Sequence, residues 1–113
     1  MHVAIIDCGV AGATLALQFV KAGFQVTVLE RQPLPARETG VAGASRKWTG
    51  RRPMTTRGVP IVGKSAHANL FFNCGHGAMG WTMACGAGKI VSDRLLGHAP
   101  SIDTSLLSHR VAG

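Results

Sequence analysis

Residues 75–88 read GHGAMGWTMACGAG, and the rest of the chain is organised around this stretch. It is rich in glycine, carries no Lys, Arg, Asp or Glu, and follows a strand-like run at 70–73. We expect it to open a helix from about residue 80 to residue 96. A glycine-rich turn before a helix presents backbone N–H groups and the positive end of the helix dipole. The stretch therefore suits an electron-rich oxygen on a ligand, although a tightly packed helix without a ligand explains it as well.

The other end of the chain predicts a βαβ unit of about thirty residues. Residues 2–6 form a β-rich run of the type found in buried parallel strands, and residues 25–30 form a second run. Between them, Leu15 and Phe19 stand four residues apart on one face of a helix that extends to about residue 22. Gly23 is a natural stop for that helix. We expect the two strands to be parallel, with a right-handed crossover.

The turn after the first strand is nearly the dinucleotide-binding fingerprint G-x-G-x-x-G. Gly9 and Gly12 match its second and third glycines. Glu30 ends the second strand about 20 residues further on, where an acidic residue hydrogen-bonds a ribose hydroxyl. The first glycine position holds Asp7, whose side chain and charge would crowd a bound pyrophosphate. The pattern therefore indicates a nucleotide site weakened by Asp7, with an ordinary βαβ unit as the alternative.

The remaining elements are expected to be short. Residues 59–62 read as a brief edge strand, and the run at 70–73 can pair nearby. Gly97 is suited to end the second helix. We expect two helices against one sheet of three or four strands, close to the lower limit for independent stability. Residues 31–57 are expected to be mobile, and the tail after residue 98 to be frayed.

Charge is distributed unevenly along the chain. There are 12 Lys and Arg against 5 Asp and Glu, and five of the cations fall in one window: Arg46, Lys47, Arg51, Arg52 and Arg57. Such a basic window is suited to phosphate, a membrane surface or nucleic acid, but a solvated loop is the interpretation that we favour. Trp48 is the only aromatic residue in it, so specific nucleic-acid binding is not expected.

Length and cysteine content limit the class of protein. With 113 residues, 46% of them hydrophobic, the chain is long enough for one small domain. Three cysteines without CxxC spacing and five scattered histidines predict reduced thiols and no metal site, as in a cytoplasmic protein. Neither a membrane span nor a signal peptide is expected, because the uncharged run after Asp7 ends at Lys21 and is too short.

Taken together, both ends of the chain resemble the FAD-dependent D-amino acid dehydrogenase family (small-subunit type), within the amino-acid oxidase and glycine oxidase superfamily. The N-terminal resemblance covers residues 3–43 and includes VTVLERQP at 26–33. The C-terminal resemblance covers residues 48–103, and its motifs are WTG at 48–50, RPMT at 52–55, GHG at 75–77 and GWTMA at 80–84. In the family these blocks are the two ends of a much longer chain, and an acid stands where this chain has Arg57.

The resemblance implies an α/β fold that is a partial Rossmann-like FAD-binding unit. It would consist of an N-terminal βαβ at 1–43, a basic junction at 44–58, and a C-terminal strand–helix block with its tail at 59–113. The substrate domain of the family would be absent, as in an internally deleted member.

The resemblance also implies roles for individual residues. FAD would be the cofactor, and Arg52 would hold the substrate carboxylate through two parallel hydrogen bonds. The pyrophosphate of FAD would be met by Gly9, Val10, Ala11 and Gly12, and its adenosine ribose by Glu30 and Arg31. The isoalloxazine ring would be met by Gly77, Met79, Gly80, Trp81 and Thr82. The family reaction is hydride transfer from the α-carbon of a D-amino acid to the flavin, and the imino acid then hydrolyses to a 2-oxo acid and ammonia. A quinone is one candidate electron acceptor, which would bring peripheral contact with the inner membrane.

Three hypotheses follow. The first is an oxidoreductase of the D-amino acid dehydrogenase type, by ancestry. The second is a remnant that binds FAD or another nucleotide without turnover. The third is a basic polypeptide that binds polyanions. We expect no measurable D-amino acid oxidation by this chain alone, because alignment of the substrate needs a closed pocket.

Overall fold

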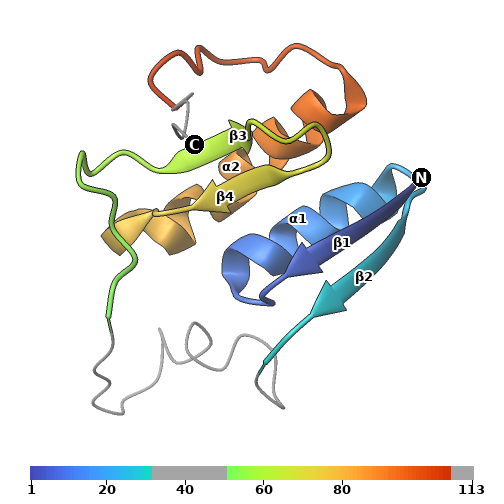
Figure 1. Cartoon of the computed structure of the whole chain (residues 1–113), viewed down its shortest axis with the longest axis horizontal. Helices are drawn as coiled ribbons and strands as arrows, with labels where there is room; N and C mark the ends of the chain where they lie inside the picture. The colour runs from blue at the N-terminus through green and yellow to red at the C-terminus, as the bar shows by residue number, and fades with distance from the viewer. Residues whose placement is uncertain (32–50, 108–113) are drawn as a thin grey trace.

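The computed structural model describes residues 1–31 and 51–107, which form a small α/β structure (Figure 1). The elements follow one another as β1 (His2–Ile6), α1 (Val10–Lys21), β2 (Gln25–Leu29), β3 (Ile61–Lys64), β4 (Phe71–Cys74), the 3-10 turn η1 (Gly77–Met79) and α2 (Gly80–Leu96). The α/β class and the positions of both helices are confirmed. β3 begins two residues later than the run at 59–62 had indicated, and Pro60 stands just before it.

β1, α1 and β2 form the expected βαβ arrangement. β1 and β2 pair in parallel, with His2 opposite Gln25 and Ile6 opposite Leu29. α1 lies across one face of this pair and buries Leu15 and Phe19 against it. The prediction that Leu15 and Phe19, four residues apart, lie on the buried face of this helix is therefore confirmed.

The expectation of one sheet of three or four strands is wrong. The described residues form two separate two-stranded sheets, because β3 pairs only with β4, in antiparallel register with Ile61 opposite Cys74. Figure 1 shows the physical reason: β1–β2 covers α1, β3–β4 covers α2, and the helices pack against each other. Each strand pair is held by its own helix, and β1 and β4 form no hydrogen-bonded ladder.

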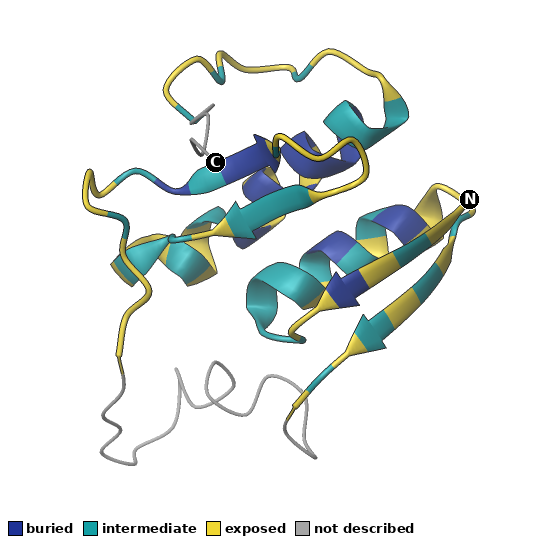
Figure 2. Ribbon diagram, in the orientation of Figure 1, coloured by how far each residue is buried: buried dark blue, intermediate teal, exposed yellow. Residues whose placement is uncertain are grey.

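β1 was expected to be buried in the manner of a central parallel strand, and this is also wrong. Only Ile5 is buried in β1, whereas Ile6 is 81% exposed and its partner on β2, Leu29, is 55% exposed. Exposed positions alternate with covered ones along both strands in Figure 2. The cause is that a single helix covers one face of the pair, whereas parallel sheets usually have both faces covered.

One hydrophobic core joins the two ends of the chain. Its buried members come from β1, α1, β3 and α2, and they are Ile5, Leu15, Phe19, Val62, Ala87, Ile90 and Val91. At the crossing of the helices, the Thr14 hydroxyl donates a hydrogen bond to the Ala84 carbonyl oxygen at 3.1 Å. Gly88 lies at the same crossing, where an added Cβ would stand 3.4 Å from the Leu15 nitrogen. The two segments that the family resemblance had identified therefore pack as one unit.

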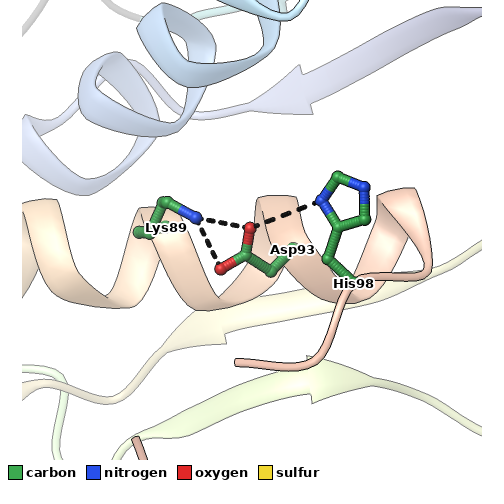
Figure 3. A network of polar contacts seen from close by, with 3 residues as sticks. All are labelled: Lys89, Asp93 and His98. Atoms are coloured by element: carbon green, nitrogen blue, oxygen red, sulfur yellow. Dashed lines mark hydrogen bonds and ion pairs between the residues drawn. The ribbon is translucent and has the colours of Figure 1, made fainter. Parts of the chain in front are cut away.

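The C-terminal end of α2 is held by polar contacts. Gly97 ends the helix in the left-handed conformation, with φ 77°, as expected. Figure 3 shows the buried carboxylate of Asp93 between the Lys89 ammonium, which donates to both of its oxygens, and His98, whose Nδ1 lies 3.9 Å away. Arg94 faces β3, where its Nη1 donates to the Val62 carbonyl oxygen.

The structure bears on two expectations about irregular segments. The tail after residue 98 is not frayed as far as residue 107, because Arg94 Nη2 donates to the Thr104 hydroxyl at 2.6 Å and Leu107 packs against the core. Within the segment expected to be mobile, residues 51–57 are attached to the rest of the structure by a backbone bridge between Met54 and His76. Residues 32–50, which make up most of the segment expected to be mobile, lie outside the described residues.

Candidate cofactor site

The helices α1 and α2 begin at the same end of the molecule. In Figure 1 both start towards the left and run towards the right, and they cross where Thr14 meets Ala84. Each of these residues is the fifth of its helix, so the crossing lies about one turn from both helix starts. The positive ends of two helix dipoles, each preceded by a glycine-containing turn, therefore point towards one region.

Asp7 has a left-handed backbone conformation in the turn that precedes α1. Its φ is 80°, and it is the only residue other than glycine with a positive φ within 1–31 and 51–107. Its backbone N–H donates to the Leu29 carbonyl oxygen at 2.8 Å. A Cβ on Gly12 would collide with the Asp7 carbonyl oxygen. Gly12 thus has the role expected of the third fingerprint glycine, a close approach of the helix to the end of the strand.

Two carboxylates accept hydrogen bonds from the backbone of this turn. Asp7 Oδ1 accepts from the Gly9 N–H at 3.0 Å, and Glu30 Oε2 accepts from the Cys8 N–H at 2.8 Å. Glu30, which directly follows β2, therefore stands beside the turn, and its contact with a ribose hydroxyl stays a prediction. Its described contact is with the turn itself, and Arg31 next to it is exposed.

The turn before α2 is built on two glycines in the left-handed region. Gly75 has φ 76° and Gly77 has φ 55°. The Gly77 N–H donates to the Pro53 carbonyl oxygen at 3.0 Å, which places the segment containing Arg52 beside the start of α2. Arg52 itself is exposed. The structure therefore brings this candidate clamp into the neighbourhood of the predicted flavin residues, although 24 residues separate Arg52 from Gly77 in the sequence.

The predicted flavin residues all lie at the start of α2. Gly77 and Met79 belong to η1, and the first three residues of α2 are Gly80, Trp81 and Thr82. The side chains of Met79 and Trp81 are large, apolar and more than half exposed. An exposed methionine and tryptophan beside a helix start provide apolar surface suited to a flat aromatic ring.

Asn73 and His76 are candidate site residues that the sequence analysis did not single out. The Asn73 side-chain oxygen and nitrogen and His76 Nε2 are buried, with no hydrogen-bond partner among the described residues. Burial also lowers the pKa of His76, which favours the neutral imidazole. Unpaired polar atoms in a protein interior are costly and need an explanation. Their position before a glycine-rich helix start was the available signal.

The basic window is only partly described. Arg51, Arg52 and Arg57 are exposed, whereas Arg46, Lys47 and the nearby Trp48 lie outside the described residues. The described residues contain no group of three or more His, Cys, Asp or Glu that could hold a metal ion. None of the helices in residues 1–31 and 51–107 has the length and apolar character needed to cross a membrane.

Comparison with known proteins finds a family match over part of the chain. Residues 40–94, which include β3, β4 and most of α2, match the family described as FAD dependent oxidoreductase. The resemblance to flavin oxidoreductases is thereby confirmed, and the cofactor of that family is FAD.

Among the 157 curated proteins that match, a D-amino acid dehydrogenase of Xanthobacter autotrophicus is 57% identical over 61 residues. Those residues are 54% of this chain but 14% of that protein's length. No solved structure matches the chain.

The two turns fit FAD to different extents. The α2 side offers an apolar surface from Met79 and Trp81, which suits the ring of a flavin, and the chain just before it carries buried polar atoms without partners among the described residues. At the α1 side, the N–H of Gly9, which would meet the pyrophosphate, is already bonded to a carboxylate. The start of α2 therefore suits the ring of FAD. At the start of α1, only Val10, Ala11 and Gly12, the first three residues of the helix, are left for the pyrophosphate.

Proposed function

We propose that this chain is a short relative of the FAD-dependent D-amino acid dehydrogenases that binds a flavin weakly and does not oxidise D-amino acids by itself. The observation that carries the proposal is that α1 and α2 begin at the same end of the molecule. The chain just before α2 contains Asn73 and His76, whose buried side-chain atoms have no partner among the described residues. The matching family and the dehydrogenase relative support a flavin as the ligand.

In this proposal the start of α2 holds the ring. Gly77 and Gly80 keep the backbone accessible, Met79 and Trp81 cover the ring, and Thr82 supplies a hydroxyl in the first turn. The first turn of α1, from Val10 to Gly12, is left for the phosphates, with Glu30 and Arg31 near the adenosine end. Bound FAD supplies a two-electron acceptor, and the helix dipole of α2 would stabilise negative charge on the reduced ring.

Arg52 is the proposed contact for the carboxylate of a D-amino acid. A guanidinium forms two parallel hydrogen bonds with a carboxylate, which fixes the orientation of the substrate. In this chain Arg52 is exposed to solvent, where such a pair contributes little. Alignment of reactants is worth roughly 7–11 kcal/mol of barrier, so an open site of this kind should show no detectable turnover.

The proposal predicts a trade-off that can be measured at Asn73. Replacing Asn73 by Leu removes two buried unpaired polar atoms, so the flavin-free chain should become more stable, by about 1–3 kcal/mol. If those atoms contact the flavin, the same variant should bind FAD and riboflavin more weakly. Asn69→Leu is the matched control, because Asn69 is exposed in the β3–β4 loop.

Flavin absorbance after gel filtration and titration of flavin fluorescence measure binding, and thermal melting measures stability. A more stable Asn73→Leu variant with unchanged flavin affinity would remove Asn73 from the site. A chain that quenches no flavin at any concentration, yet is retained on heparin, would favour polyanion binding instead.

A further inference from the structure

The backbone donors that open the fingerprint turn are already bonded to acidic groups of this chain. Asp7 Oδ1 accepts from Gly9, and Glu30 Oε2 accepts from Cys8. A dinucleotide uses backbone N–H groups at this end of the helix to hold its pyrophosphate. A carboxylate and a phosphate require the same donors and carry the same sign of charge, so they compete for one position.

Asp7 adds a carboxylate to the turn while its backbone adopts a conformation typical of glycine. The first fingerprint glycine serves a tight turn, and Asp7 adopts φ 80° in its place. Aspartate tolerates this region better than most residues, because its short side chain bonds its own backbone two residues on. The bond from Gly9 to Asp7 Oδ1 is of this kind. The close packing of Gly12 on Asp7 is retained as well.

We infer that Asp7 is an internal occupant of the pyrophosphate site, so that this chain gains little from the phosphates of FAD and binds a neutral flavin such as riboflavin about as well. The inference rests on the proposed flavin site at the start of α2. That site contains neither Asp7 nor Gly9, so riboflavin binding should be independent of Asp7.

Titration of FAD and riboflavin against the wild-type chain, Asp7→Gly and Asp7→Asn tests this selectivity. Asp7→Gly should tighten FAD by on the order of tenfold and leave riboflavin unchanged. Asp7→Asn loses the charge but keeps the acceptor oxygen, so its FAD affinity should lie between the other two. Equal FAD affinity for all three chains, or a parallel change in riboflavin affinity, would overturn the inference. An equal gain in FAD affinity for Asp7→Gly and Asp7→Asn would show that only the charge of Asp7 weakens binding, and would overturn the inference that its side chain occupies the pyrophosphate site.

A second measurement does not depend on flavin binding. The amide proton resonance of Gly9 should move upfield in Asp7→Gly, because its hydrogen bond is lost, and should stay near its wild-type position in Asp7→Asn. The same Gly9 resonance in all three chains would refute the bond to Asp7. If neither flavin binds any chain, the proposed function fails, while the Gly9 resonance still decides whether Asp7 occupies the turn.

Discussion

The crossing of α1 and α2 can be tested by two glycines on the same helix. Gly88 faces α1, where an added Cβ would lie 3.4 Å from the Leu15 nitrogen and 3.5 Å from the Thr14 hydroxyl. Gly86 is exposed, and a Cβ added there would meet nothing within 4 Å. We therefore compare Gly88→Leu with Gly86→Leu, which make the same chemical change two residues apart in α2.

The magnitudes follow from helix propensity and packing. Replacing a helical glycine by leucine stabilises a helix by about 0.8 kcal/mol, so Gly86→Leu should raise the melting temperature by a few degrees. Gly88→Leu gains the same propensity but forces a side chain into a packed contact, which costs about 1–3 kcal/mol. The two variants should then differ by about 1–3 kcal/mol, or at least about 4 °C in Tm for a domain of this size.

Thermal and urea unfolding followed by circular dichroism at a helix wavelength measure both variants under identical conditions. Gly88→Ala provides a graded control, because its single Cβ stands at ordinary contact distance and should be tolerated. If Gly88→Leu were as stable as Gly86→Leu, the helices would not cross at Gly88. That result would contradict the arrangement in which α1 and α2 begin side by side, and with it the flavin site proposed at their starts.

Three further predictions concern catalysis, pH and charge. FAD-loaded chain should show no anaerobic bleaching with excess D-alanine, and rapid bleaching that is lost in Arg52→Ala but kept in Arg51→Ala would contradict this. Burial lowers the pKa of His76, so the imidazole binds a proton more readily in the unfolded chain than in the folded one. The free energy of unfolding should therefore fall as the pH drops below about 6.5. In thermal melts between pH 5 and pH 8, about the limits of histidine titration, His76→Gln should reduce this dependence of stability on pH. Retention on heparin should weaken steeply with salt, and retention that persists at moderate salt but is abolished by neutralising Arg46, Lys47 and Arg51 together would instead support a specific polyanion site.

Local patterns predicted the elements of this fold well. The 3.6-residue period placed α1 and α2, and the left-handed glycine at Gly97 marked the end of α2 as expected. The second strand and its parallel pairing with the first were also correct. These features depend on residues close together in the sequence, so sequence periodicity is sufficient to find them.

The candidate site was less predictable because it depends on how distant segments meet. The sequence identified Asp7 as an obstacle but offered no indication that its carboxylate bonds Gly9. The burial of Asn73 and His76 was not predictable either, since it arises from packing against elements elsewhere in the chain. The roles of Arg52 and of the residues from Gly77 to Thr82 remain predictions.

The sequence by itself determined two local features: a βαβ turn related to a dinucleotide fingerprint, and a glycine-rich helix start in a segment that is similar to flavin oxidoreductases. Tertiary structure alone decided that the strands form two separate pairs, and that Ile6 and Leu29 remain exposed. The physical reason is that a strand's pattern reports which residues are apolar but not whether a second layer covers them. That depends on long-range packing, and here the contact between α1 and α2 sets it.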